Sequence, residues 1–266
     1  MSFQIVVLAK QVPDTHNVGA DAMNPDGTVN RAALPVVFNP EDLKALEMAL
    51  RVKDQMPDAK VTVVTMGPPR AAEIVKDARN RGADDGVVLS DMRFAGADTL
   101  ATSYAISQLV KQLGKVDLIF GGRQAIDGDT AQVGPQVAEK LDIPQVTYAE
   151  ELLAVTPREI TIRRRLEHGT ECVKAQLPAL VTVTSAAADC RFPNAHRMLR
   201  LAKDEVRMVN ADSIDADMDR LGLKGSPTKV KKIENVVLAH KESVVLDPTE
   251  AALNALSATL IQEHIL

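Results

Sequence analysis

Short runs rich in Val, Ile and Leu alternate along the first half of this chain with longer amphipathic stretches, and this alternation limits the fold more than any other feature. The apolar runs lack a polar residue at every second position, which is typical of strands buried on both faces of a sheet. A repeat of strand and helix predicts a doubly wound parallel sheet, because parallel strands must be joined by crossovers. We therefore expect a Rossmann-like α/β fold of the adenine-nucleotide-binding kind. The expected strands and helices lie at residues 3–9, 41–53, 60–67, 69–81, 85–90, 98–113 and 116–122.

The segments after Pro144 have a different pattern. Four runs carry alternating or β-branched residues and are separated by short polar turns. Such runs predict antiparallel additions to the edge of the sheet. They occupy residues 145–152, 158–166, 171–177 and 179–185.

The last part of the chain is expected to form an arm and a helix. Periodicity weakens over residues 186–244, which indicates an extended arm. Asp247 as cap and Pro248 at the first helical position then predict a helix with one apolar stripe. We expect this helix to pack on a partner subunit, although it could instead fold back on the sheet. This interpretation divides the chain into a nucleotide- or flavin-binding domain, residues 1–190, and an arm with a C-terminal helix, residues 191–266.

Charge, hydropathy and cysteine content restrict the binding partners and the cellular compartment that we expect for the protein. The formal net charge of -5 argues against general affinity for nucleic acids. No apolar run approaches the roughly 20 residues that cross a bilayer, so no direct membrane insertion is expected. Cys172 and Cys190 lack metal-ligand spacing, and no signal-sequence pattern is present. We therefore expect reduced thiols and a cytoplasmic protein.

Residues 118–135, LIFGGRQAIDGDTAQVGP, place a glycine-rich polar loop between a predicted strand and a predicted helix. The apolar residues before Gly122 indicate the end of a buried strand, and Val133 and Val137 have helical spacing. Open α/β sheets bind ligands at the carboxyl ends of their strands, and a helix N-terminus offers unpaired N–H groups to an anion. The loop is therefore predicted to bind a nucleotide phosphate. The same edge would gather the loops at residues 9–14, 38–42, 65–69 and 94–99.

Acid–base, metal and triphosphate motifs are absent from the sequence. The five histidines are scattered, and no nucleophilic triad or cluster with metal-ligand spacing occurs. Neither GxxxxGK[ST] nor GxGxxG is present. We therefore predict no catalytic residue and no metal site. The residues alone support a protein that holds a nucleotide cofactor, and they leave open a stand-alone nucleotide-sensing domain.

With these residues considered, most of the chain resembles the beta subunit of electron transfer flavoproteins. The motifs that carry the resemblance are VVLAKQVPD, FNPED, VTMGPP, FAGADT, GGRQAIDGDTAQVGP and IRRRLEHGTECVKAQLPALVT. His168 is a mild departure, because the pattern usually has an acidic residue or glycine there. The resemblance implies a partner alpha subunit, with which the chain shuttles electrons through flavin.

The resemblance also implies a nucleotide site. In ordinary members this site holds AMP as a structural ligand, whereas in bifurcating members it holds a second FAD, which takes a hydride from NADH and splits the electron pair. Gly128 stands where the AMP-binding type tends to have an acidic residue, and Gly128, FAGADT and GLKGSPTKV are all similar to the bifurcating group. A carboxylate would repel a diphosphate, whereas glycine leaves room for it. The implied cofactor-binding residues are Ala9, Asn39, Pro40, Glu41, Asp42, Met66, Gly122, Arg123, Gln124, Ala125, Ile126, Asp127, Gly128, Asp129, Thr130, Ala131, Gln132 and Val133.

Further partners follow from the same resemblance. In the bifurcating interpretation the electrons pass to ferredoxin or flavodoxin and to a dehydrogenase, and NADH oxidation belongs to the assembled complex. Members of the family dock acyl-CoA dehydrogenases through a loop that reads AAADCRFPNAHRM in this chain. We therefore expect the partner to be either an acyl-CoA dehydrogenase or a lactate-type dehydrogenase. The alternative is a non-bifurcating beta subunit that holds structural AMP and passes electrons from a dehydrogenase through the FAD of the alpha site.

Overall fold

The computed structural model describes residues 2–14, 35–228, 243 and 245–265. Compact packing divides the chain into two units, Met1–Lys231 and Lys232–Leu266. The first unit holds a sheet with its covering helices, and the second holds a single described helix. The two units are described separately below.

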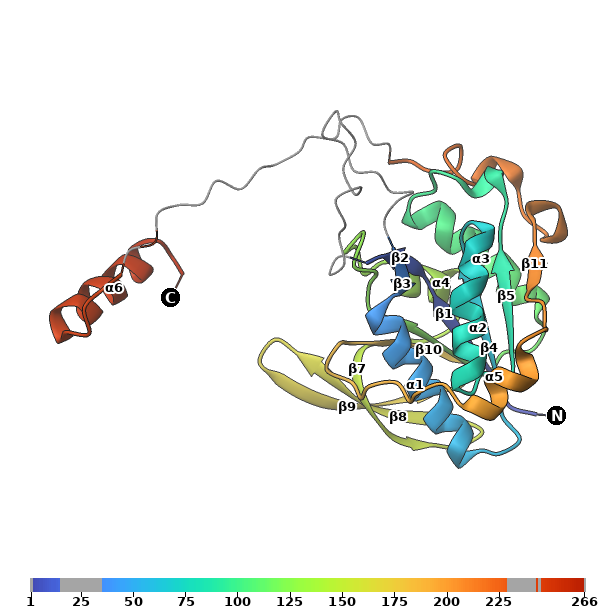
Figure 1. Cartoon of the computed structure of the whole chain (residues 1–266), viewed down its shortest axis with the longest axis horizontal. Helices are drawn as coiled ribbons and strands as arrows, with labels where there is room; N and C mark the ends of the chain where they lie inside the picture. The colour runs from blue at the N-terminus through green and yellow to red at the C-terminus, as the bar shows by residue number, and fades with distance from the viewer. Residues whose placement is uncertain (1, 15–34, 229–242, 244, 266) are drawn as a thin grey trace. The chain divides into compact units, whose positions relative to one another are not determined.

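A nine-stranded sheet forms the centre of the first unit (Figure 1). Its strands are β1 (Gln4–Ala9), β4 (Lys60–Met66), β5 (Asp85–Leu89), β6 (Leu118–Gly122), β7 (Gln145–Val155), β8 (Glu159–Leu166), β9 (Gly169–Gln176), β10 (Ala179–Val183) and β11 (Arg207–Val209). They follow the order β11-β5-β4-β1-β6-β10-β7-β8-β9. Neighbours from β11 to β7 are parallel, and β8 and β9 are antiparallel additions. A separate antiparallel pair is formed by β2 (Gln11–Pro13) and β3 (Val36–Phe38).

Helices cover both faces of this sheet. The helices of the first unit are α1 (Pro40–Gln55), α2 (Ala72–Arg81), α3 (Thr99–Gln112), α4 (Val133–Leu141) and α5 (Ala195–Leu201). One core cluster joins Leu46 of α1 to Val7 of β1, and a second joins Leu109 of α3 to Val6 on the opposite face of the same strand. Helix α2 contributes to the first cluster and α4 to the second. The predicted doubly wound sheet is thereby confirmed.

Local sequence signals set where several helices begin and end. Pro40 occupies the first position of α1, where its missing N–H costs no hydrogen bond. The Asp98 carboxylate caps α3 by accepting from the N–H of Ala101 at 3.0 Å. Gly82 ends α2 with a φ of 142°, a conformation that favours glycine.

The strand order reverses at β1. From β1 the chain winds outward through β4 and β5, and it then crosses to β6 on the other side of β1. The loops that leave β1 and β6 therefore diverge at a topological switch point. Ligands of open α/β sheets bind in the crevice that such a point creates.

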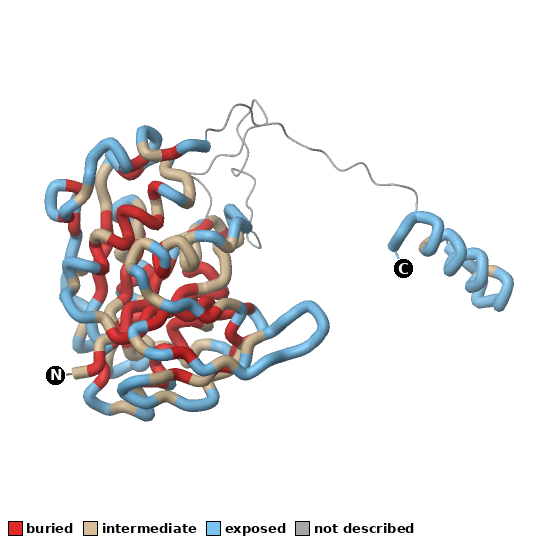
Figure 2. The backbone as a smooth tube through the Cα atoms, turned by 180° about the vertical axis from the view of Figure 1, so that it is seen from behind, coloured by how far each residue is buried: buried red, intermediate tan, exposed pale blue. Residues whose placement is uncertain are grey.

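The structure corrects the prediction of antiparallel edge strands for residues 145–152 and 179–185. Strand β7, which includes residues 145–152, lies between β10 and β8, parallel to β10 and antiparallel to β8. Strand β10 does not extend the edge of the sheet but lies between β6 and β7, parallel to both. All five of its residues are buried, so its β-branched composition reflects contact with helices on both faces. Buried residues concentrate in these central strands, whereas the outer end of the β8–β9 hairpin is exposed (Figure 2).

Residues 191–228 pack against the sheet rather than forming a free arm. Strand β11 pairs with β5, and α5 contacts α2. Packing thus groups these residues with the first unit, while a functional division at residue 190 stays a prediction. Residues 229–242 of the predicted arm lie outside the described residues.

The second unit contains α6 (Glu250–Gln262), which has no buried residue (Figure 2). Its cap is Thr249, whose hydroxyl accepts from the N–H of Ala252 at 3.3 Å, and not Asp247 as predicted. The helix therefore begins two residues after Pro248. Among the helices of the described ranges, none is both long and apolar enough to cross a membrane.

Candidate functional site

The parallel register brings the predicted site residues to one edge of the sheet. Ala9 ends β1 and pairs with Thr65, the residue before Met66 at the end of β4. On the other side of β1, Leu8 pairs with Gly121, so Gly122 ends β6 at the same level. The loops after β1 and β6 therefore flank the switch point. The sequence prediction of a shared edge holds for these three strands.

The first turn of α1 is tied to the loop after β6. Asn39 donates from Nδ2 to the carbonyl of Gln124 at 2.9 Å and accepts from the N–H of Ile126 at 3.2 Å. Glu41 accepts from the N–H of Gln124 at 2.9 Å and forms an ion pair with Arg123 at 3.1 Å. These side chains thus hold the loop in place, and their polar atoms face protein groups.

Asp42 connects three segments of the site. Its carboxylate accepts from the N–H of Lys10 at 2.8 Å and from the N–H of Gly122 at 2.9 Å. Burial raises the pKa of the Asp42 carboxyl to about 7, although these two N–H groups and the Asn39 side chain act in the opposite direction. Asp42 is therefore a buried, bridging carboxyl that fixes the ends of β1 and β6 against α1.

Gly122 is required by the close approach of α1. A Cβ atom at this position would lie 2.4 Å from Oδ1 of Asp42 and 2.8 Å from its backbone nitrogen. Backbone atoms cannot yield to such a contact, so any larger residue would displace the start of α1. This glycine serves the assembly of the site.

The backbone of residues 129–133 has the features of an anion-binding loop. Asp129 and Ala131 adopt left-handed conformations, with φ of 47° and 52°. Within the described residues, the N–H groups of residues 130–133 have no hydrogen-bond acceptor. Ala131 is followed by Gln132 in the right-handed region, and such a pair of residues is suited to direct neighbouring N–H groups toward one anion. The loop then enters α4 at Val133, whose helix N-terminus adds a favourable dipole.

Gly128 has a different environment from Gly122. A Cβ atom at Gly128 would have no heavy atom within 4 Å, and its backbone is outside the left-handed region. Its N–H donates to the carbonyl of Ala125 at 3.2 Å. Neither packing nor backbone conformation therefore requires glycine at this position.

Sequence reasoning missed three residues that contact this loop. Lys10 donates from Nζ to both carboxylate oxygens of Asp127, at 2.7 and 2.8 Å. The guanidinium of Arg123 lies 5.7 Å from the ring centre of Tyr148, which itself has a φ of 62°. Thr99 donates to Oε1 of Gln132 at 2.9 Å. Lys10 and Thr99 lie in the loops of residues 9–14 and 94–99 that the sequence placed at this edge, although neither was among the predicted site residues. The contact of Tyr148 joins a segment that no motif connects to the loop.

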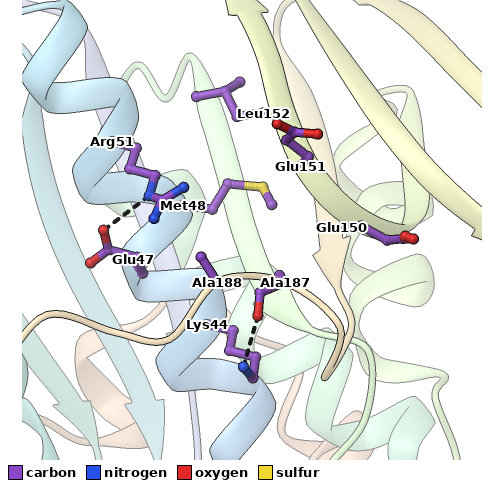
Figure 3. Close-up of a pocket in the computed structure, with 9 residues that line it drawn as sticks. All are labelled: Lys44, Glu47, Met48, Arg51, Glu150, Glu151, Leu152, Ala187 and Ala188. Atoms are coloured by element: carbon purple, nitrogen blue, oxygen red, sulfur yellow. Dashed lines mark hydrogen bonds and ion pairs between the residues drawn. The ribbon is translucent and has the colours of Figure 1, made fainter.

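Two hollows of the surface lie away from this edge. The first, between α1, β7 and the segment after β10, has a volume of about 10 Å³ and is too small for a nucleotide (Figure 3). In it Lys44 donates to the carbonyl of Ala187, and Glu47 pairs with Arg51. The second includes Ser2, Pro57 and Asp84. Neither hollow includes a residue of the predicted nucleotide site.

The sheet and its loops define a doubly wound α/β protein with a polar, glycine-containing loop at its topological switch point. Residues 26–214 match the electron transfer flavoprotein domain. The chain belongs to the electron transfer flavoprotein family, among the beta subunits.

Relatives of known name match 85% or more of the chain. The electron transfer flavoprotein subunit beta of Clostridium acetobutylicum is 45% identical over 260 residues, 98% of each chain. Protein FixA of Sinorhizobium fredii is 40% identical over 264 residues, 97% of this chain and 92% of the relative. The caffeyl-CoA reductase-Etf complex subunit CarD of Acetobacterium woodii is 41% identical over 227 residues, 85% of this chain and 86% of the relative.

Proposed function

We propose that this chain is the beta subunit of an electron-bifurcating electron transfer flavoprotein, and that the loop of residues 122–133 binds the diphosphate of FAD. The main support for the proposal is the presence of glycine at position 128. Since neither space nor φ at this position requires glycine, the absence of a side chain is better explained by a ligand than by the fold. A diphosphate next to the loop would be repelled by a carboxylate at this position.

The groups that would hold the nucleotide are mostly backbone atoms. The N–H groups of residues 130–133 and the start of α4 are suited to phosphate oxygens. Asn39, Glu41 and Asp42 act on the loop instead, since their polar atoms bind its backbone. When bound, FAD would supply the site with hydride acceptance from NADH, after which electrons would pass to ferredoxin or flavodoxin and to a dehydrogenase.

A second candidate is a non-bifurcating beta subunit with AMP in the same loop. Asp127 and Asp129 favour it, because two carboxylates in one short loop suit a single phosphate better than a diphosphate. In that case the nucleotide would be structural, and electrons would pass only through the FAD of the alpha subunit.

Helix α6 supports the proposal that the partner is an alpha subunit. A helix of 13 residues is only marginally stable in water by itself, and none of the residues of α6 is buried. Leu253 and Ile261 are more than half exposed. An apolar surface on a partner would cover them and stabilise the helix.

The names of two relatives bear on the second partner. One is a subunit of a caffeyl-CoA reductase-Etf complex. Another, from Anaerotignum propionicum, is named acryloyl-CoA reductase electron transfer subunit gamma and is 42% identical over 234 residues, 86% of this chain and 82% of the relative. We therefore favour a partner acting on acyl-CoA esters over a lactate-type dehydrogenase, in a cytoplasmic complex.

The nucleotide content of the purified complex tests the proposal. The chain would be produced together with its alpha subunit, and the nucleotides released by denaturation would be separated and quantified. We expect two FAD per heterodimer and no AMP. One FAD and one AMP would support the second candidate, and a chain that purifies as a colourless monomer without an alpha subunit would contradict both.

A further inference from the structure

Carboxylates surround the proposed nucleotide loop, and each faces an internal donor. Glu41 and Asp42 bind backbone N–H groups of the loop and of the end of β1, as described above. Asp129 accepts from Nε2 of Gln124 at 2.7 Å. Asp127 is held by Lys10. The loop and the first turn of α1 thus combine backbone N–H groups suited to an anion with four acidic side chains that would oppose it unless their charge is compensated.

Lys10 is the cation placed for this compensation at Asp127. Its backbone is fixed on both sides, because its N–H donates to Asp42 and its carbonyl accepts from the N–H of Asn39 at 3.0 Å. Its side chain then reaches from the end of β1 across the switch point to Asp127, 117 residues further along the chain. Both oxygens of Asp127 lie within 2.8 Å of the ammonium nitrogen.

The position of this ion pair indicates a role other than stability. The Lys10 side chain is 47% exposed and that of Asp127 is 31% exposed. Exposed ion pairs contribute little to the free energy of unfolding, because water already solvates both charges well. A negative charge in the loop would nevertheless act directly on an anion bound by the adjacent N–H groups.

We propose that Lys10 is a specificity-determining residue: by neutralising Asp127 it allows the loop to accept a nucleotide with more than one phosphate charge. This inference rests on the proposed nucleotide site. It predicts that the contribution of Lys10 to nucleotide affinity depends on the charge of the ligand. Binding of an uncharged nucleoside should not depend on Lys10, whereas binding of a diphosphate should.

The test compares Lys10→Met, Lys10→Arg, Asp127→Asn and the double variant Lys10→Met/Asp127→Asn in the complex with the alpha subunit. After removal of bound nucleotide, affinities for FAD, AMP and adenosine would be measured by calorimetry, and melting temperatures on the same samples. We expect Lys10→Met to bind FAD on the order of tenfold or more weakly, as repulsion by an uncompensated carboxylate requires. Adenosine binding and the melting temperature should not change. Lys10→Arg should retain FAD affinity, and Asp127→Asn should restore it in the double variant.

The outcomes separate the inference from the proposed function. Equal FAD affinity of Lys10→Met and the wild type would overturn the inference alone. A double variant as weak as Lys10→Met would also overturn it, because the lysine would then act on the phosphate directly and not through Asp127. A wild-type complex that binds neither FAD nor AMP would overturn the proposed function and this inference together.

Discussion

At the scale of single residues, Gly128 offers the most direct test of the diphosphate site. Gly128→Asp would place a carboxylate in open space in the loop, so we expect the fold to tolerate it. Like-charge repulsion between this carboxylate and a bound diphosphate would cost on the order of 1–3 kcal/mol, or roughly tenfold to more than a hundredfold in affinity. The variant should lose the FAD of the beta site and keep the FAD of the alpha site.

Gly128→Asn is the matched control for this change, since it has nearly the same shape without the charge. It should retain more FAD than Gly128→Asp. Flavin stoichiometry and melting temperature would be measured on the same samples. A folded Gly128→Asp heterodimer that keeps both flavins would refute the placement of the diphosphate at this loop.

Asp42 gives a prediction about pH. Its pKa is raised from 3.8 to about 7 in the folded chain, so the folded state binds a proton that the unfolded state has released. The contribution of Asp42 to the free energy of unfolding therefore falls as pH rises from about 4 to about 7. Asp42→Asn cannot accept at both positions and leaves one partly buried N–H unpaired, at a cost of about 1–3 kcal/mol.

The titration of Asp42 in the wild type and the unpaired N–H in the variant both affect how the stability difference between the two proteins depends on pH. Asp42→Asn should be less stable than the wild type near pH 4. This difference should shrink and then change sign toward pH 7, because the wild type loses more stability over this range than one unpaired N–H costs, whereas the variant has no titrating carboxyl at this position. Urea unfolding of both proteins across this pH range would measure the difference in their free energies of unfolding. A difference that is constant with pH would refute the raised pKa.

The residues of the site differ in how far sequence could predict them. Ala9, Met66 and Gly122 follow from apolar runs that end in polar or glycine residues, and the structure brings them to one edge. The left-handed conformations of Asp129 and Ala131 could not be predicted, because neither residue is glycine and the reason lies in the loop as a whole. The role of Asp42 depends on a hydrogen bond across 80 residues of chain, which no local pattern contains.

At the scale of elements, α6 provides the test of assembly. Removing residues 248–266 should weaken the heterodimer, because the exposed apolar side chains of α6 would no longer be buried against the alpha subunit. Sedimentation velocity of the two subunits at several concentrations would measure this. The full-length variant Leu253→Ser/Ile261→Ser should act in the same direction, whereas Asn254→Ala/Gln262→Ala on exposed polar positions should not. Undiminished assembly of the truncated chain would contradict the proposed packing.

The elements also show where pattern analysis succeeds. Strands β1, β4, β5 and β6 were predictable because unbroken apolar runs between amphipathic stretches have few other solutions. The position of β10 was not, since its five buried residues match either an interior strand or a covered edge. Its neighbours in the sheet, β6 and β7, lie earlier in the chain, and only tertiary pairing decides between the two positions.

At the scale of the whole molecule, the sheet explains why a nucleotide would bind at β1 and β6. The chain winds away from β1 in one direction and resumes on its other side, so the loops after these two strands separate and leave the crevice that open α/β sheets use. The motifs predicted the loops, but the order of the strands decides which loops meet. The hollow beside α1 and β7 has no such topological reason to bind a nucleotide.

The contacts between Lys10 and Asp127, and between Asp42 and Gly122, join segments separated by 117 and 80 residues. Contacts between segments so distant along the chain form slowly, because the entropy of closing the intervening loop must be overcome first. The loop therefore acquires its final shape only after β1, α1 and β6 have come together. A ligand that binds this shape adds to the stability of the folded chain by mass action, so cofactor supply would influence how much newly made protein reaches its native state.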